Sequence, residues 1–318
     1  MSTRRIALLG ATGSIGRQAL DVVAANPDLA VCALSSGSQP LDVLAAELGV
    51  EHTQVGGDVT ELLERAEPDI VLNAVVGFAG VGATLWALDN GVTLALANKE
   101  SLVAAGDLAL DAWRRGEGLL LPVDSEHSAL HQCLDGHGPG TIDSATLANK
   151  GLELIEAHYL FGLDYGRIEV VVHPTSVVHA LVRFRDGASL AHLGYPDMRV
   201  PISFALTFPD RRATPIPALD FSAGLTLEFE APDLDRFPLL GLAREAGERG
   251  GTYPCAFNAA NEVAVHAFLD GRIRFVEIAR LVQDALDAVD GAPAHDLAQL
   301  VEADEEARRL AQGRLAPA

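Results

Sequence analysis

Apolar residues in the first half of the chain form short continuous runs that are separated by amphipathic stretches. The first run lies in residues 4–16, RRIALLGATGSIG, and ends in a turn with glycines at positions 10, 13 and 16. Five further apolar runs predict strands, the first two of them at 30–34 and, more weakly, 52–55, and the others at 68–74, 91–97 and 118–123. Helical patterns lie between them, at 17–25, 40–48, 58–66 and 101–113, and around Trp86. Strands that alternate with helices predict a parallel sheet with both faces covered.

The second half of the chain has a different pattern. Short apolar or alternating runs predict the strands of a small sheet at 168–172, 177–184, 189–193 and 225–229. Residues 239–318 are mostly helical, with apolar periodicity in 257–269 and 276–288 and an acidic amphipathic stretch at 296–312. The predicted fold is therefore α/β, with a Rossmann-like parallel sheet in residues 1–123, an α+β catalytic and dimerisation domain in 124–235, and a helical domain in 236–318.

The glycine-rich turn is typical of the start of a nucleotide-binding fold, where backbone amides and a helix N-terminus bind a pyrophosphate. Its spacing, G-x-x-G-x-x-G, suits a variant of that fold, although a turn without a ligand is the alternative. After the second strand no acid is present that would bind the ribose hydroxyls of NAD. The small polar residues there, from Ser35 to Gln39, leave room for a 2′-phosphate and favour NADPH.

Composition excludes several classes of partner and indicates the compartment of the protein. The net charge of −21 argues against nucleic acid or an anionic membrane as a partner. No apolar run reaches the roughly 18 residues that a membrane span needs, and residues 1–7 read as the approach to a first strand rather than as a signal peptide. Three widely spaced cysteines, Cys32, Cys133 and Cys255, argue against a disulfide framework or a zinc cluster. We therefore expect a cytoplasmic protein.

The candidate chemistry lies between Leu121 and Glu153. Asp124 and Glu126 follow an apolar run, and residues two apart on an extended segment share a face, so we expect both to project from the end of a strand. Residues 143–146, DSAT, predict a helix entry, after which Asn149, Lys150 and Glu153 share one helix face. Three converging carboxylates suit a hard divalent ion such as Mg²⁺ or Mn²⁺. Ordinary solvated acids are the alternative in a chain this acidic.

Two lysines and several histidines lie close to these acids. Of the 23 basic residues only Lys99 and Lys150 are lysines, each preceded by Asn, and Lys99 follows a predicted strand at the edge where parallel sheets bind ligands. A solvated loop lysine is the alternative. His173 and His179 are the histidines nearest this site, with a structural role as the alternative. Histidines 127 and 131 have no second metal-ligand cluster, so we interpret both as residues of a helix surface.

Several motifs taken together resemble the 1-deoxy-D-xylulose 5-phosphate reductoisomerase family. They occur in the order of that family from the first strand to the last helices: GATGSIG, LANKES, PVDSEH, DSATLANKGLE, HPTSVVH, GYPDMR and NAANEVAV. The resemblance implies an NADPH-dependent homodimer of the non-mevalonate isoprenoid route. It would rearrange and reduce a sugar phosphate to 2-C-methyl-D-erythritol 4-phosphate with Mn²⁺ or Mg²⁺, and Co²⁺ is also compatible.

The resemblance also implies roles for residues at matching motif positions. It implies catalytic roles for Lys99, Glu126, Glu153 and His179, and a metal site made by Asp124, Glu126 and Glu153. The substrate would contact Ser125, Ser144, Asn149 and Lys150, the last three of these at its phosphate. NADPH would contact Thr12, Gly13, Ser14, Ile15, Gly37, Asn98 and Glu100, with Met198 near the nicotinamide.

The chain departs from the family pattern in three places. Family members have a Ser-Gly-Gly phosphate loop and a lid with Trp and Met-Gly between the DSEH and DSAT motifs, whereas only residues 127–143 occupy that interval here. The stretch between Ser38 and Pro68 is also shorter, and Ser38 and Gln39 stand where the family has a basic residue and Asn. We therefore expect impaired phosphate binding, slow turnover and a weaker preference for NADPH.

Two rival functions stay open from the sequence. A dehydrogenase of the aspartate-semialdehyde type also starts with a G-A-T-G turn, and it would need Cys133 as a nucleophile. A non-catalytic homologue without the lid is the second rival. The retained acids and lysines argue against it, because a nucleotide sensor has no need of a metal site.

Overall fold

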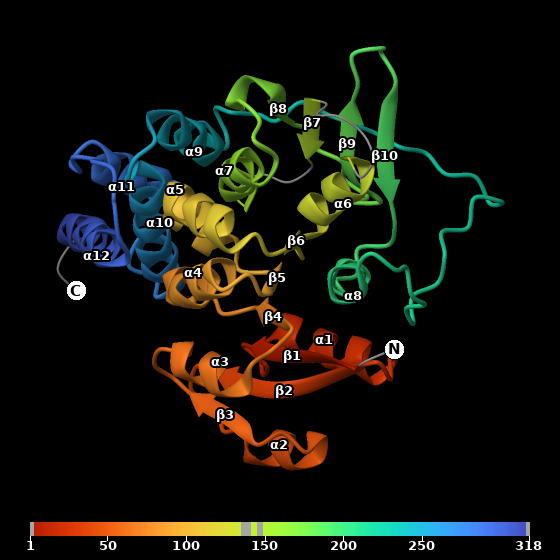
Figure 1. Cartoon of the computed structure of the whole chain (residues 1–318). Coiled ribbons are helices and arrows are strands. Elements are labelled where there is room, and N and C mark those ends of the chain that lie inside the picture. The colour runs from red at the N-terminus through yellow and green to blue at the C-terminus, as the bar shows by residue number, and fades with distance from the viewer. Residues whose placement is uncertain (1–2, 135–140, 145–148, 316–318) are drawn as a thin grey trace.

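The computed structural model describes residues 3–134, 141–144 and 149–315, and the side chains of 141–144 are not described. Six parallel strands form one sheet in the order β3-β2-β1-β4-β5-β6 (Figure 1). The strands are β1 (Arg4–Leu9), β2 (Leu29–Ser36), β3 (His52–Val55), β4 (Ile70–Asn73), β5 (Thr93–Leu96) and β6 (Leu120–Pro122). This sheet confirms the predicted Rossmann-like start of an α/β fold.

The helices that connect these strands lie on both faces of the sheet. They are α1 (Ser14–Ala24), α2 (Asp42–Leu48), α3 (Thr60–Ala66), α4 (Val81–Asp89) and α5 (Lys99–Gly116), with a 3₁₀ helix, η1 (Gly77–Gly80), before α4. Along β1 the side chains alternate between two cores: Ile6 and Leu8 belong to one, and Ala7 and Leu9 to the other. Each is at most 1% exposed. A strand with two buried faces needs a continuous apolar run, which is the pattern of the sequence.

A second, four-stranded sheet has the order β10-β9-β7-β8. Its strands are β7 (Thr141–Ser144), β8 (Ile168–Val170), β9 (Val178–Arg183) and β10 (Ser189–Leu193), and only β7 and β8 are parallel. The helices around it are α6 (Ser125–Leu134), α7 (Asn149–Phe161) and α8 (Arg199–Thr207), with the 3₁₀ helix η2 (Tyr165–Arg167). The predicted strand at 225–229 is wrong, because this stretch is irregular and a single bridge joins Val172 to Glu230.

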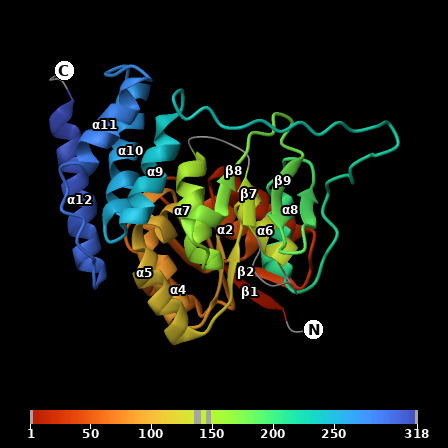
Figure 2. The same ribbon diagram turned by 90° about the horizontal axis from the view of Figure 1, so that it is seen from above.

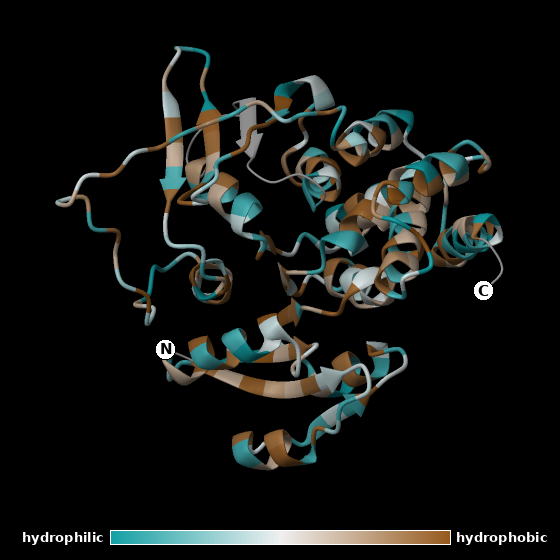
Figure 3. Cartoon of the chain, turned by 180° about the vertical axis from the view of Figure 1, so that it is seen from behind, coloured by the Kyte–Doolittle hydropathy of each residue, from teal (hydrophilic) through white to brown (hydrophobic). Residues whose placement is uncertain are grey.

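The last four helices are α9 (Pro238–Arg249), α10 (Tyr253–Leu269), α11 (Glu277–Leu286) and α12 (Leu297–Arg314). Figure 2 shows α12 at the outer edge of the molecule, beside α10. These helices carry both apolar and polar residues (Figure 3), as expected for helices with one buried side. Across the described residues, each helix is too short or too polar to cross a membrane.

Segment 209–237 is an extended arm that leaves the body of the molecule between α8 and α9 (Figure 1). Several of its large apolar side chains are exposed to solvent: Phe221, Leu225, Leu227, Phe229 and Leu234. Burial of such side chains is favourable, at about 25 cal/mol per Å² of apolar surface. The arm therefore presents an apolar surface that is largely open to solvent among the described residues of this single chain.

Candidate active site

The site begins at the carboxyl ends of two neighbouring strands. β5 and β6 pair in parallel, with Leu96 opposite Pro122, so the residues that follow them emerge side by side. Lys99 opens α5 after β5, and Asp124 follows β6. The Nζ atom of Lys99 lies 2.5 Å from Oδ2 of Asp124. The sequence prediction that Lys99 faces a site at this edge of the sheet agrees with this geometry.

Asp124 and Glu126 converge by a different local geometry from the one we predicted. The strand ends at Pro122 and α6 begins at Ser125, so Glu126 lies in the first turn of a helix rather than on an extended segment. The amide of Ser128 donates to the Asp124 carbonyl at 2.8 Å, which closes this first turn. The strand interpretation is therefore wrong for Glu126, which belongs to α6, whereas Asp124 does follow the end of β6.

Helix α7 supplies the remaining groups of the site. Its predicted entry at 143–146 is wrong, because β7 occupies Thr141–Ser144 and the helix starts at Asn149. Glu153 Oε1 accepts from Lys99 Nζ at 2.7 Å and from Asn149 Nδ2 at 2.5 Å. Lys150 Nζ lies 2.6 Å from Glu126 Oε1 and also contacts the Glu153 carboxylate. The predicted shared face of Asn149, Lys150 and Glu153 is confirmed.

Carboxylate oxygens of Asp124, Glu126 and Glu153 lie within 4.8 Å of one another. Three carboxylates and no softer ligand suit a hard cation such as Mg²⁺ or Mn²⁺. The two lysine ammonium groups lie between the same oxygens, where they offset the repulsion of the three negative charges. We refer to these three acids and two lysines as the lysine–carboxylate cluster.

Burial gives these groups unusual protonation behaviour. Burial disfavours the charged form of Lys99, but Asp124 and Glu153 outweigh it and hold the pKa of its ammonium above the usual value. Burial also opposes the charge of Asp124, yet Lys99 keeps the pKa of that carboxyl well below its usual range. Burial and the charge of Asp124 raise the pKa of the Glu153 carboxyl to about 7. The Glu153 carboxyl therefore takes up a proton more readily than an exposed glutamate does.

His127 is not on the helix surface, and that prediction is wrong. Its side chain is 2% exposed, and it packs between β6 and α7. Its Nδ1 atom lies 3.0 Å from Oε2 of Glu156, and its Nε2 lies 3.0 Å from the carbonyl oxygen of Glu153. Sequence reasoning missed Glu156, whose one available signal is its place a turn after Glu153 on the same helix.

Ser125 and His179 line one small pocket beside the cluster, with His192 and Tyr195. His179 is 8% exposed, and burial lowers the pKa of its imidazole, so its neutral form is favoured. The hydroxyl of Ser125 donates to Glu126 Oε2 at 2.5 Å. His173 lies apart, with Nδ1 2.7 Å from the carbonyl of Glu228 and its ring stacked on Phe229.

Part of the predicted phosphate site lies outside the described side chains. The backbone of Ser144 belongs to β7, but its side chain is not described, and residues 135–140 and 145–148 lie outside the structure's description. Asn149 is exposed, whereas Lys150 is buried within the cluster. Asn149 and Lys150 share the start of α7, and the phosphate-binding roles of these two residues and of Ser144 stay predictions.

The glycine-rich turn leads into α1 at the carboxyl end of β1. Gly10 has φ +81°, and the amides of Gly10 and Ala11 donate to the Ser35 carbonyl at 3.1 and 2.8 Å. Gly13 and Ser14 are exposed where α1 begins, so the helix N-terminus is open to an anion. Thr12 and Ile15 are half-buried beside them, and Gly37 is exposed after β2. This arrangement suits a nucleotide with two phosphates.

Three further residues were predicted to contact the cofactor: Asn98, Glu100 and Met198. The Asn98 side chain is buried and already engaged, since its Nδ2 donates to the Gly77 carbonyl at 2.9 Å and its Oδ1 accepts from the Ser101 amide at 2.8 Å. Glu100 is half-buried. Met198 precedes α8, which packs on α1. The Asn98 side chain therefore fixes the loop at η1, and its predicted contact with NADPH stays a prediction.

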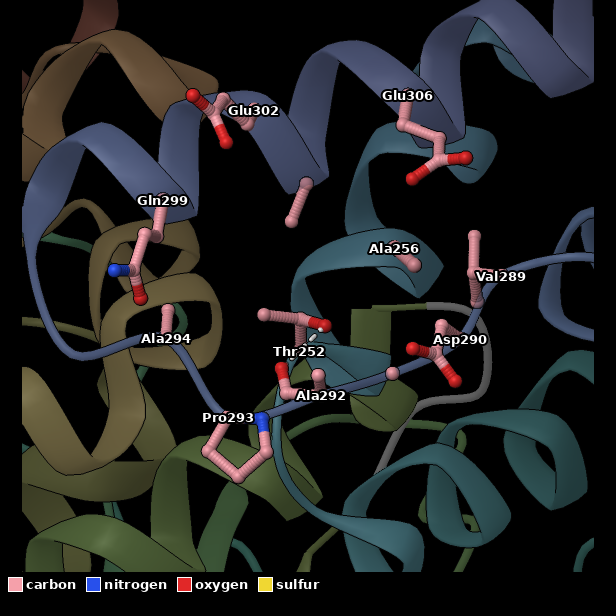
Figure 4. A pocket seen from close by; sticks show the side chains of 12 residues that line it. Thr252, Ala256, Val289, Asp290, Ala292, Pro293, Ala294, Gln299, Glu302 and Glu306 are labelled. Carbon is pink, nitrogen blue, oxygen red and sulfur yellow. Dashed lines mark hydrogen bonds between the residues drawn. The ribbon is translucent and has the colours of Figure 1, made fainter.

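Another cavity, of about 270 Å³, lies between the start of α10, the segment 289–294 and α12 (Figure 4). Its charged lining residues are all acidic: Asp290, Glu302 and Glu306. A field of one negative sign repels phosphate groups. This cavity therefore does not suit a nucleotide or a sugar phosphate.

Comparisons with known proteins agree with the motifs. The family model described as 1-deoxy-D-xylulose 5-phosphate reductoisomerase matches residues 6–56 and 41–106, and the model of the DXP reductoisomerase C-terminal domain matches residues 193–310. A further C-terminal domain model of the same enzyme matches residues 138–161.

Relatives of the same name cover nearly the whole chain. The 1-deoxy-D-xylulose 5-phosphate reductoisomerase of Heliobacterium modesticaldum is 42% identical and that of Rhodococcus jostii is 44% identical, over 98% and 97% of this chain and 97% and 93% of theirs. The first alignment spans 381 positions, more than the 318 residues of this chain, so the relative has segments that are absent here. This finding agrees with the shortened intervals that we noted in the sequence.

Solved structures of these enzymes share the fold. The enzyme from Zymomonas mobilis in complex with NADPH superposes with a TM-score of 0.89 at 37% identity, covering 100% of both chains. A DOX-P reductoisomerase in complex with NADPH, fosmidomycin and magnesium gives a TM-score of 0.88 at 33% identity, covering 98% of both chains.

Proposed function

This chain belongs to the 1-deoxy-D-xylulose 5-phosphate reductoisomerase family, and we propose that the lysine–carboxylate cluster is the centre at which it acts. The chain is an NADPH-dependent and divalent-metal-dependent oxidoreductase. It rearranges and reduces 1-deoxy-D-xylulose 5-phosphate to 2-C-methyl-D-erythritol 4-phosphate in non-mevalonate isoprenoid biosynthesis.

The observation that carries this proposal is the convergence of Asp124, Glu126 and Glu153 within 4.8 Å. These three carboxylates would hold the divalent ion, which when bound supplies Lewis-acid polarisation of the ketone and adjacent hydroxyl oxygens of the substrate. Lys99 lies against the carboxylates of Asp124 and Glu153, and its positive charge would stabilise the negative charge that develops on the substrate during the rearrangement. The neutral imidazole of His179 and the Ser125 hydroxyl can hydrogen-bond the substrate from the adjoining pocket.

We propose that Lys150 and Asn149, at the start of α7, bind the substrate phosphate. The ammonium of Lys150 forms ion pairs with Glu126 and Glu153. It would therefore link the phosphate end of the site to the metal end. Binding of the remote phosphate positions the reacting carbons, which is how binding energy contributes to rate. Ser144 would add a third phosphate contact, in line with its motif.

For the cofactor, we propose that the pyrophosphate of NADPH lies at the open N-terminus of α1. Thr12 and Gly13 belong to the turn before α1, Ser14 and Ile15 open the helix, and Gly37 would lie near the ribose. The nicotinamide would lie toward Met198. When bound, the cofactor would supply the hydride that reduces the aldehyde formed by the rearrangement.

The properties of Cys133 argue against the alternative function, a dehydrogenase of the aspartate-semialdehyde type. Its side chain is 9% exposed, and burial raises the pKa of its thiol. A nucleophilic cysteine needs a lowered pKa and access to substrate. Cys133 has neither, so it does not serve as a catalytic nucleophile.

We also propose that the chain forms a homodimer and works in the cytoplasm. The exposed apolar side chains of the arm at 209–237, Phe221 and Phe229 among them, support a dimer, because a second copy could cover them. Three free cysteines, at 32, 133 and 255, support a reducing compartment. Sedimentation that shows a monomer at micromolar concentration would contradict the dimer.

The experiment that tests the function follows NADPH oxidation with 1-deoxy-D-xylulose 5-phosphate, with and without Mn²⁺. Oxidation that needs both the sugar phosphate and the metal supports the proposal. Oxidation that ignores the metal contradicts the role of the cluster. An iodoacetamide-treated sample serves as a control, since loss of activity by alkylation of Cys133 would restore the rival reading.

A further inference from the structure

Glu156 is a buried carboxylate that the proposed chemistry does not use. It lies on α7, its side chain is fully buried, and its two oxygens have no hydrogen-bond partner among the described residues apart from the ionic contact with His127. Removal of a carboxylate from water is costly unless a paired charge compensates it. Its partner therefore indicates what the group does.

His127 connects Glu156 to two of the proposed metal ligands. Its Nε2 lies 3.0 Å from the carbonyl oxygen of Glu153, and because a carbonyl only accepts, Nε2 must carry a proton. Its Nδ1 lies 3.0 Å from Glu156 Oε2 and 3.4 Å from Asp124 Oδ1. Nδ1 makes no hydrogen bond with either carboxylate, so both are close ionic contacts between the ring and the two acids.

The ring thus contacts two parts of the chain that are distant in sequence. Asp124 lies at the end of β6, and Glu153 lies on α7. His127 contacts the side chain of the first and the backbone of the second. If the ring turned, both ligands would lose a contact at once. Glu156 lies 3.0 Å from the Nδ1 atom of the same ring, where its carboxylate can hold the ring in this orientation.

We propose that Glu156 is a positioning residue for the divalent-metal site, acting through His127 on Asp124 and Glu153. This proposal rests on the proposed function of the lysine–carboxylate cluster. Partners behind metal ligands of this kind orient the ligand, and their replacement typically costs about 10- to 100-fold in metal affinity. One ligand atom each of Asp124, His127 and Glu156 also lies within 4.8 Å of the other two, so a second bound ion is the competing interpretation.

The test compares Mn²⁺ binding by the wild type and its variants. Each protein is titrated with Mn²⁺, and free Mn²⁺ is detected by electron paramagnetic resonance. Glu156→Gln keeps the shape of the side chain and removes its charge. We expect its Mn²⁺ dissociation constant to rise at least about tenfold, with the NADPH affinity unchanged. Glu156→Asp keeps the charge and should give an intermediate constant, and it also keeps the test decisive if the Gln variant fails to fold.

A double variant examines the route through His127. If Glu156 acts through the imidazole, His127→Asn with Glu156→Gln should bind Mn²⁺ no more weakly than His127→Asn alone. Asp304→Asn is a matched control, because it also removes a buried carboxylate, one that pairs with Arg308 on α12. We expect it to lower Tm and to leave Mn²⁺ binding unchanged.

Three outcomes would overturn the inference, and each has a separate signature. Unchanged Mn²⁺ affinity with a lowered Tm in Glu156→Gln would make the residue structural only. Two Mn²⁺ ions per chain in the wild type, with one lost in the variant, would make these atoms a second metal site. A wild-type chain that binds no Mn²⁺, or a Glu153→Gln variant that binds it as tightly as the wild type, would overturn the proposed function and this inference with it.

Discussion

Lys99 Nζ lies 2.7 Å from Glu153 Oε1, although 54 positions of sequence separate the two residues. Lys99 comes from the edge of the large sheet and Glu153 from α7, so this contact joins the nucleotide-binding part of the chain to the part that carries the second sheet. It also explains why the carboxylates can converge, because an ammonium group lies against each of them. Metal binding must therefore compete with these internal cations.

Replacing Glu153 with Gln should abolish Mn²⁺-dependent activity. The change removes one of the three carboxylates and leaves the glycine-rich turn and α1 untouched, so we expect NADPH binding to stay nearly intact. Calorimetric titration with Mn²⁺ and with NADPH separates the two effects. Glu64→Gln, at an exposed position of α3, is the control. Equal metal affinity in wild type and Glu153→Gln would contradict the assignment.

Turnover of the sugar phosphate should be slow. The chain lacks the Ser-Gly-Gly loop of the family, and each charge-assisted hydrogen bond lost is worth roughly 1.5–3 kcal/mol. The loss of two would weaken substrate binding by about two to four orders of magnitude. Without a lid, water also competes for the polar groups of the site.

Steady-state kinetics decide this second prediction. We expect a high KM and a low kcat, with NADPH binding and metal binding preserved. Values typical of a lidded enzyme would show that another segment replaces the lid. Leu134 to Gly140 is the segment we consider for that role, and its residues 135–140 lie outside the described structure.

Replacing His192 with Gln should make the fold less sensitive to acid. Burial, with the charges of His179 and Arg211, lowers the pKa of His192 to about 4, whereas an unfolded histidine has a pKa of about 6.5. Between these values the unfolded state binds more protons, so the stability of the wild type falls as pH decreases from about 6.5 to 4. The variant has no such titration and should be more stable than the wild type at pH 5, relative to pH 7, by about 1–2 kcal/mol.

Urea unfolding at pH 7 and pH 5 measures the effect of His192→Gln. His295→Gln is the control, because His295 is exposed. An identical change in midpoint for wild type and His192→Gln would show that His192 titrates normally in the folded chain. That result would rule out the proposed effect of its burial.

Replacing Gly10 with Ala should damage both the fold and the cofactor groove. Gly10 has φ +81°, and a Cβ atom there would lie 2.5 Å from the carbonyl oxygen of Ala74. Strain of this kind costs about 1–3 kcal/mol, and relief of it would shift the turn that opens α1. We expect a lower Tm and weaker NADPH binding, measured by thermal unfolding and by cofactor fluorescence.

The control for that change is Gly313→Ala on α12, where a Cβ atom meets nothing within 4 Å. Alanine is a better helix former than glycine, so this variant should be as stable as the wild type or more stable. Wild-type NADPH affinity in Gly10→Ala would contradict the proposed place of the pyrophosphate.

The sequence by itself determined the features that depend on near neighbours. The apolar run from Ile6 to Leu9 predicts a strand with two buried faces, and the structure has one. The i, i+3 and i, i+4 spacing of Asn149, Lys150 and Glu153 predicts one helix face, and these side chains do meet. Periodicity carries this information because a helix or strand fixes the direction of each side chain from its position.

Only the tertiary structure decided which distant side chains meet. The contact of Lys99 with Glu153, the burial of His127 against Glu156 and the irregular course of 225–229 each depend on how separate segments pack. Local pattern could not show that α6 starts at Ser125, because PVDSEH suits a strand end and a helix start equally. Such choices follow from the free energy of burying and pairing groups across the whole chain, which no short stretch of sequence contains.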